Sequence, residues 1–262
     1  RCGICPLSIV TVRAEANDTS EMVTQLLYGD HFEITGIRPK WIKIRIAFDS
    51  YDGWIDENQA FKIDELTFQN LQETSTYSTD LIGLMTTSSS QLMPVCIGSA
   101  VHASELLSHH FDGSTNANYN KTQLVDTAML YLNSPYLWGG KSPFGIDCSG
   151  FTQMVYKISL IPLYRDAYQQ AKQGQALSFI EESEPGDLAF FDNEEGHIIH
   201  VGIMMKNNYI IHAHGQVRID RIDHSGIFNE DINRYSHNLR VIKKIVEKLV
   251  LKPKENQNPS SL

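Results

Sequence analysis

The sequence predicts an α+β protein in which two small β-modules precede a larger mixed domain. The chain has 262 residues, enough for one large domain or several small ones. Hydrophobic residues make up 42% of it, a share typical of globular proteins. Short strand-like segments dominate the N-terminal part, whereas helical and strand patterns alternate after about residue 118. These observations indicate several folded units and exclude a wholly disordered chain.

The first unit, residues 1–62, is expected to form a small β-barrel. Residues 41–46 alternate apolar and polar side chains with period two, which is typical of a half-buried strand. The pair Asp52-Gly53 is expected to form a turn between strands. Residues 63–112 contain more Ser and Thr and again show short apolar segments, which predicts a second small β-module.

The third unit, residues 118–250, mixes helices and strands. A capping pattern and apolar spacing predict a helix over 121–133. A second helix is expected over 148–159, with its apolar residues on one face. The tail, 251–262, is polar and charged and is expected to be flexible. The expected strands are 187–191, 198–205, 208–212 and 217–222.

Charge and hydrophobicity limit the classes of partner. The formal net charge of −9 disfavours nucleic acid, because binding a phosphate backbone requires a basic face. It suits a partner that carries an amino group. No apolar stretch approaches about eighteen residues, so no membrane span is expected. Position 1 is Arg and the apolar run near it is short, so no secretory signal is visible.

Four cysteines are too few for a disulfide scaffold in a chain of this length. Cys2 and Cys5 form a C-x-x-C pair, but a structural zinc site needs about four ligands and no second pair follows. Cys96 lies in an apolar run and is expected to be a small buried side chain. We expect no metal and no cofactor, and Cys148 remains as the cysteine with distinctive surroundings.

Cys148 lies where a glycine-containing loop meets the second expected helix. A thiol at a helix N-terminus faces unpaired backbone N–H groups and the positive end of the helix dipole. Both favour the thiolate, the nucleophilic form. A buried cysteine at a helix start is the structural alternative.

A nucleophilic cysteine needs a base, usually histidine. His200 and His212 lie on two strands that are expected to form a hairpin, and their separation of twelve is even. With a three-residue loop they share one face, directly opposite or diagonal. One ring could act as base toward Cys148 while the other orients it. Strand parity is expected to exclude His197 and His214.

A set of short motifs carries a family resemblance. The C-terminal motifs are Tyr136–Gly140 (YLWGG), Gly145–Phe151 (GIDCSGF), Pro185–Leu188 (PGDL), His200–Ile203 (HVGI) and Ile211–Ala213 (IHA). Over roughly residues 118 to 245 the chain resembles the NlpC family of bacterial cell-wall cysteine peptidases. Residues 20–29 and 49–55 are similar to bacterial SH3-like domains. The branch with such domains ahead of the peptidase contains γ-D-glutamyl-diamino-acid dipeptidyl peptidases, which trim murein peptides.

The resemblance implies a papain-like cysteine peptidase domain preceded by two small SH3-like β-barrels. Within it, Cys148 would be the nucleophile, His200 the general base and His212 the orienting residue. Tyr136 matches a family tyrosine near the oxyanion site, where it would donate together with the backbone N–H of Cys148.

The resemblance also implies a set of substrate-binding residues. Trp138, Asp147 and Ser149 would line the cleft. Asp166 would hold the free α-amino group of the substrate, and Ala167 stands where some members have Ser, which leaves a backbone contact or none. The far end of the cleft would be closed by residues of the first module, Glu21 and Tyr51. Three of these residues, Glu21, Asp147 and Asp166, carry carboxylates, which suit an ammonium group.

These features lead to one main hypothesis and two alternatives. The main hypothesis is hydrolysis of the γ-D-Glu–diamino acid bond in murein peptides with a free N-terminal L-Ala, which releases L-Ala-D-Glu. The first alternative is an amidase or acyltransferase on the same fold, because the same groups serve any acyl transfer. The second is a mainly peptidoglycan-binding protein. We expect a monomer; the identity of the diamino acid (Lys or diaminopimelate) and the compartment (cytoplasm, or periplasm and cell envelope) stay open.

Overall fold

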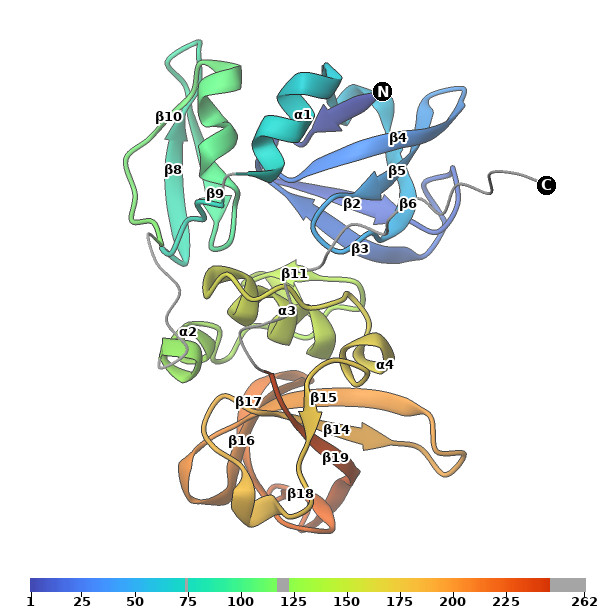
Figure 1. The fold of residues 1–262 in the computed structure, drawn as a ribbon, viewed down its shortest axis with the longest axis vertical. Coiled ribbons are helices and arrows are strands. Elements are labelled where there is room, and N and C mark those ends of the chain that lie inside the picture. Colours follow the sequence, from blue (N-terminus) through green and yellow to red (C-terminus); the bar gives the residue numbers. More distant parts are fainter. Residues whose placement is uncertain (74, 117–122, 246–262) are drawn as a thin grey trace, which may run out of the picture.

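The computed structural model describes residues 1–73, 75–116 and 123–245. Figure 1 shows two small β units side by side and a larger unit below them, with a layer of helices between the upper units and the lower sheet. No helix in the described ranges is long and apolar enough to cross a membrane. The predicted flexible tail, 251–262, lies outside these ranges.

The first unit is a curled antiparallel sheet with strand order β3-β2-β6-β5-β4-β1-β7. Its apolar core includes Val10, Leu26, Phe32 and Ile44, and along β2 buried side chains alternate with partly exposed ones. The strands are β1 (Cys2–Ile4), β2 (Ile9–Arg13), β3 (Met22–Leu27), β4 (His31–Arg38), β5 (Trp41–Ile46), β6 (Asp52–Asp56) and β7 (Phe61–Ile63), and helix α1 (Glu65–Gln72) follows them.

The predicted turn at Asp52-Gly53 is wrong, because both residues lie within β6 and pair with β5. The chain turns earlier, at Ser50, which has a positive φ of 60°, and the Asp49 carboxylate accepts the N–H of Tyr51 there. Glycine at 53 serves close packing instead. A Cβ at this position would lie 2.3 Å from a methyl carbon of Val12.

The second unit is a three-stranded sheet with order β10-β8-β9. A 3-10 helix, η2 (Val101–Leu107), lies beside it. Cys96 is buried at the end of β9, as predicted. A second SH3-like barrel is not confirmed, since the described residues here form only this small sheet. The strands are β8 (Ile82–Thr86), β9 (Leu92–Cys96) and β10 (His110–Phe111).

The third unit combines short helices with a six-stranded antiparallel barrel. The strand order is β13-β19-β14-β15-β16-β17-β18, and an additional pairing of β18 with β19 closes the barrel. Its strands are β13 (Gln175–Ala176), β14 (Leu188–Asp192), β15 (Ile198–Met204), β16 (Tyr209–His214), β17 (Gln216–Ile222), β18 (Gly226–Asn229) and β19 (Arg234–Lys244).

The helices of this unit cover the barrel (Figure 1). Helix α3 (Cys148–Ile158) is buried along its whole length and shares a core with β14 and β15. The prediction of a helix over 148–159 is therefore confirmed. The earlier helix, α2 (Leu124–Leu130), is shorter than predicted, and residues 121–122 lie outside the described ranges. The remaining elements are β11 (Lys141–Ser142), β12 (Gly145–Ile146) and α4 (Ala167–Gln170).

Buried polar contacts join the first unit to helix α3. Lys157 Nζ lies 2.7 Å from Asp30 Oδ1, and both side chains are almost fully buried. Nearby, Gln153 Nε2 donates to Asp49 Oδ2 at 2.8 Å. A buried charge is costly unless it is paired, so these contacts favour one relative placement of the two units.

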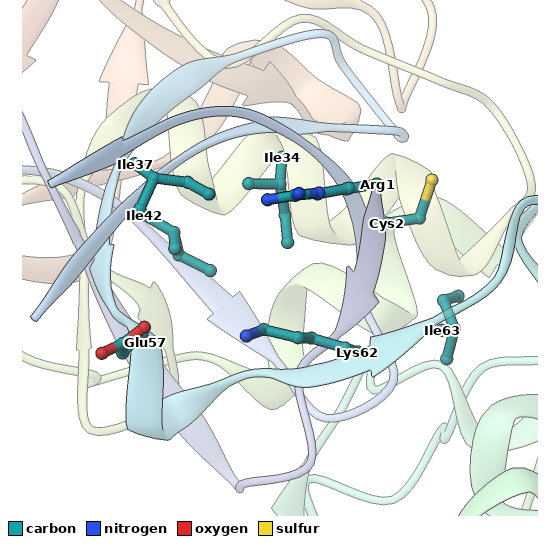
Figure 2. Close-up of a pocket in the computed structure, with 8 residues that line it drawn as sticks. All are labelled: Arg1, Cys2, Ile34, Ile37, Ile42, Glu57, Lys62 and Ile63. Atoms are coloured by element: carbon teal, nitrogen blue, oxygen red, sulfur yellow. The ribbon is translucent and has the colours of Figure 1, made fainter.

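A pocket of about 300 Å³ lies in the first unit. Figure 2 shows Arg1 and Lys62 extending into it among several isoleucines. The pocket contains none of the predicted site residues. Cys2 lines it, but its thiol donates to Glu65 whereas that of Cys5 donates to the Leu7 carbonyl. The two thiols thus have separate partners, in keeping with a structural role.

Candidate active site

Cys148 is the first residue of α3, at the helix start that the sequence predicts. Asp147 caps this helix, since its Oδ1 accepts the backbone N–H of Gly150 at 2.6 Å. Its Oδ2 accepts the N–H of Gly139 at 2.8 Å. One carboxylate therefore ties the glycine loop to the helix and fixes the backbone that carries the thiol.

The thiol of Cys148 is held in its neutral form. Burial raises its pKa to about 12, and the charge of Asp147 acts in the same direction. The backbone N–H groups of Val201 and Ser149, and the Arg165 charge, lower the pKa by less. The expectation of a preformed thiolate is therefore wrong. The main physical reason is burial, and the capping carboxylate of Asp147 at the positive end of the helix adds to it.

His200 on β15 and His212 on β16 form the predicted pair. Gly202 lies opposite His212 in the register, so the two histidines are diagonal neighbours on one face. His200 Nε2 lies 2.8 Å from His212 Nδ1, and both rings are buried. The N–H of Met205 donates to the Tyr209 carbonyl, and residues 206–208 between them form the predicted three-residue loop. The prediction that the pair shares a face is confirmed.

Asp220 on β17 extends this pair and is not among the residues that the sequence predicts for the site. His212 Nε2 lies 2.9 Å from Asp220 Oδ2. Arg218 donates two hydrogen bonds to the same carboxylate, from Nε at 2.7 Å and from Nη2 at 2.8 Å. Burial would raise the pKa of Asp220, but hydrogen bonds from His212 and Arg218 outweigh it and lower that pKa. The sequence feature that could have indicated it is an Asp within the alternating apolar and polar pattern of residues 217–222.

The hydrogen bonds fix the tautomers of both rings. Because His212 Nε2 faces a carboxylate, it carries the proton and leaves Nδ1 as an acceptor. His200 then donates from Nε2 and keeps its lone pair on Nδ1. Burial and the neighbouring His212, His237 and His214 lower the pKa of His200 well below its ordinary value. The base is therefore neutral.

Two more histidines surround the pair. His237 on β19 stacks on His200 with ring centroids 4.1 Å apart and an interplanar angle of 22°. His214 lies 6.5 Å from His200, so its exclusion by strand parity is wrong. It is two residues beyond His212 on the same strand and therefore on the same face. His197 is exposed and lies 3.3 Å from Glu195, away from the cluster as expected.

The thiol of Cys148 lies beside the backbone of β15, the strand that carries His200. The N–H of Val201, the residue after His200, is the hydrogen-bond donor beside the thiol. Among the described residues, no hydrogen bond joins the Cys148 sulfur to His200. In catalysis a direct thiol–imidazole contact would form when substrate binds, as catalytic hydrogen bonds that are long in the resting state often do.

Tyr136 is half-buried near the thiol. Burial raises its pKa to about 12, and the neighbouring Cys148 and Asp147 contribute. Its phenol therefore keeps its proton and can donate a hydrogen bond. The backbone N–H of Tyr136 donates to the Gly215 carbonyl at 2.9 Å, which anchors the loop to the β16–β17 turn.

Asp147 and Ser149 belong to a buried arginine network. Arg165 Nη1 and Nη2 contact the two oxygens of Asp147 at 3.0 and 2.6 Å. Arg165 Nη1 also donates to Ser149 Oγ at 3.1 Å, and Nε donates to Thr24 Oγ1 of the first unit at 2.8 Å. Both oxygens of Asp147 are occupied. Contrary to expectation, this carboxylate is therefore not available to a substrate ammonium.

The first unit contacts the third beside this network. Trp138 Nε1 donates to Glu21 Oε1 at 2.6 Å, and the Trp138 side chain is 62% exposed. The Tyr51 hydroxyl donates to Asp166 Oδ1 at 3.3 Å. Ala167 follows as the first residue of α4 and is buried. The structure thus brings Glu21 and Tyr51 to the predicted cleft residues.

A helix-borne cysteine packed on a β-barrel, beside a strand with a paired histidine, places the third unit in the class of cysteine peptidases. Residues 133–234 match the NlpC/P60 family. Residues 12–59 match the bacterial dipeptidyl-peptidase Sh3 domain. The chain therefore carries an NlpC/P60 domain behind a bacterial SH3 domain.

Known relatives match this chain over different shares of its length. The gamma-D-glutamyl-L-lysine dipeptidyl-peptidase of Bacillus subtilis (strain 168) is 40% identical over 92 residues, which cover 34% of this chain and 31% of that protein. Dipeptidyl-peptidase 6 of Lysinibacillus sphaericus is 27% identical over 251 residues, covering 80% and 88%. The match to the Bacillus subtilis relative thus spans about a third of its length.

Solved structures share the fold. An NlpC/P60 family protein from Bacillus cereus ATCC 10987 superposes with a TM-score of 0.71 at 19% identity, covering 92% of this chain and 99% of that one. An NlpC/P60 endopeptidase from Photobacterium damselae subsp. piscicida gives a TM-score of 0.62 at 15% identity, covering 92% and 70%.

Proposed function

We propose that the protein hydrolyses the γ-D-Glu–diamino acid bond of murein peptides that have a free N-terminal L-Ala, and so releases L-Ala-D-Glu. The observation that carries this proposal is the contact of the first unit with the predicted substrate-binding residues of the third. Glu21 touches Trp138, and Tyr51 touches Asp166, next to the loop that holds Cys148. The names of the two relatives support the same class of substrate.

Acyl transfer would begin with a neutral pair. As the Cys148 sulfur attacks the γ-carbonyl carbon of D-Glu, its proton passes to Nδ1 of His200. His212 accepts the Nε2–H of His200 and Asp220 accepts that of His212, so the imidazolium is stabilised as it forms. His200 then gives its proton to the leaving amine of the diamino acid, and a thioester remains.

Water completes the reaction. His200 takes a proton from the attacking water, the thioester bond breaks, and the thiol is restored with the release of L-Ala-D-Glu. At both stages the tetrahedral oxyanion would accept hydrogen bonds from the Tyr136 hydroxyl and from the N–H of Cys148. That N–H lies in the first turn of α3, where it has no intrahelical acceptor.

Selectivity for a free amino terminus would come from Glu21 and Asp166. These two carboxylates lie on opposite units and each contacts an aromatic residue of the other unit. An ammonium between them gains charge-assisted hydrogen bonds, which an acetylated nitrogen cannot make. A cleft closed by the first unit also limits the peptide to two residues before the scissile bond.

Product analysis tests the proposal. The protein is incubated with L-Ala-γ-D-Glu-L-Lys or with its diaminopimelate equivalent, and the products are identified by mass spectrometry. We expect L-Ala-D-Glu from the wild type and from C96A, which removes another buried thiol, but none from C148A. Cleavage by C148A, or cleavage at a different bond, would contradict the proposal and favour a different acyl transfer.

A further inference from the structure

Three histidines of the site form a compact group of nitrogen donors. His200, His212 and His237 each offer one ring nitrogen, and these atoms lie within 4.8 Å of one another. They come from β15, β16 and β19, strands of one closed barrel, so the barrel backbone holds them together. His200 and His212 are buried and His237 is partly buried.

We propose that these three histidines bind a divalent transition-metal ion, with Zn²⁺ as the best match, and that the bound ion reversibly inhibits the enzyme. The binding site stands by itself, whereas the inhibition rests on the proposed function. Imidazole nitrogens suit zinc, and three protein ligands leave a fourth position for water.

The distances are near those of a tetrahedral site. Zinc–nitrogen bonds of about 2.0–2.1 Å place two tetrahedral nitrogens about 3.3 Å apart. His200 Nε2 and His212 Nδ1 are 2.8 Å apart, slightly closer than this, while the widest separation in the group is 4.8 Å. Small rotations of the side chains, largest for the partly buried His237, would bring all three nitrogens to an ion.

Outer hydrogen bonds prepare two of the ligands. Asp220 accepts the Nε2–H of His212, so the Nδ1 lone pair points at His200, as in the carboxylate–histidine–zinc arrangement. The Ser236 hydroxyl lies 2.9 Å from His237 Nδ1, which leaves Nε2 as the ring nitrogen for an ion. These partners favour binding without a new hydrogen-bond network.

Coordination would inhibit by moving a proton. His200 carries its proton on Nε2, the nitrogen that faces His212. When the metal takes that nitrogen, the proton moves to Nδ1 through solvent, and the ring stays neutral. Nδ1 then has no lone pair for the proton of Cys148, so the base is lost until the ion leaves.

Binding is measured first and without substrate. Chelator-treated protein is titrated with ZnCl₂ by calorimetry and with CoCl₂ by visible absorption. The variant H237F keeps an aromatic ring against His200 but removes a ligand, and H197F changes an exposed histidine as the matched control. We expect one Zn²⁺ per chain for wild type and H197F, and at least about tenfold weaker binding for H237F.

The variant C148A tests whether the ion binds to the histidines or to the thiol. It should bind Zn²⁺ within about threefold of the wild type, because the proposed ligands are the histidines. Unchanged affinity in H237F, or loss of binding in C148A, would overturn the site. So would the absence of binding to the wild type at 100 µM Zn²⁺.

Inhibition is then expressed relative to the metal-free rate of each variant. We expect the half-inhibiting Zn²⁺ concentration to rise at least about tenfold in H237F, with EDTA restoring the wild-type rate. Equal inhibition of both proteins would contradict the inhibitory role. If metal-free protein cleaves no murein peptide, the proposed function fails, while the binding titrations still decide the site.

Discussion

Changing Asp220 to Asn should lower kcat by about 30-fold. The side chain keeps its shape but loses its negative charge. Its amide oxygen should still face His212 Nε2, because Arg218 Nε donates to the same position at 2.7 Å and excludes an NH₂ group there. The variant therefore replaces a charged acceptor behind His212 and His200 with a neutral one, which stabilises the imidazolium less.

The magnitude follows from the charge that the acceptor loses. A hydrogen bond to a charged group is worth about 1.5–3 kcal/mol. Since about 1.4 kcal/mol corresponds to tenfold in rate, a loss of about 2 kcal/mol in the transition state gives about 30-fold. The carboxylate acts through His212 and His200, so Asp220 is a positioning residue and substrate KM should change little.

Steady-state kinetics with L-Ala-γ-D-Glu-L-Lys measures the effect. The control is D231N, because Asp231 contacts the same Arg218 at 2.8 Å but is 72% exposed. An exposed ion pair contributes little, so D231N should stay within about twofold of the wild type. The reasoning is refuted if folded D220N keeps a kcat within twofold, or if D231N and D220N lose equally.

Three further outcomes are expected. Alkylation of Cys148 by iodoacetamide, followed by mass spectrometry, should be slow at pH 7 and accelerate up to at least pH 10, because burial raises the thiol pKa to about 12. A plateau near neutral pH would contradict a neutral thiol. E21Q and Y51F should each raise KM about five- to tenfold for the free peptide with kcat nearly constant in steady-state assays. E21Q removes the negative charge proposed to bind the substrate ammonium, and Y51F removes the hydroxyl that donates to Asp166. A fall in kcat alone would contradict this role. In urea unfolding, K157M should lose about 3–5 kcal/mol because Asp30 is left buried and unpaired, and K157M/D30N should lose less.

The sequence predicts the parts of the site that local patterns encode. The glycine loop and apolar spacing place Cys148 at the start of a helix. The even separation of His200 and His212 predicts a shared face, because side chains alternate along a strand. Both inferences need only short stretches of chain, which is why they agree with the structure.

The rest depends on long-range pairing. His237 reaches the site from β19, whose register shifts by a bulge against both β14 and β18. A bulge changes which face a side chain takes, so parity counted along the sequence cannot place it. Asp220 likewise depends on the pairing of β16 with β17.

The charge state of the thiol was also beyond the sequence. A cysteine at a helix start predicts a thiolate only if the helix end is free. Here Asp147 caps that end and burial outweighs the nearby donors, a balance that depends on packing. The raised pKa of Cys148 and the lowered pKa of His200 therefore both favour the neutral form in the resting protein.

The central proposal is that the protein acts as a cysteine peptidase that binds the free amino terminus of its substrate before it cuts. The most direct test is the ratio of kcat/KM for L-Ala-γ-D-Glu-L-Lys to that for its N-acetylated form. Loss of the ammonium contact with Glu21 and Asp166 should make this ratio at least about 30, by the energy of a charge-assisted hydrogen bond. Equal kcat/KM for both peptides would contradict the account.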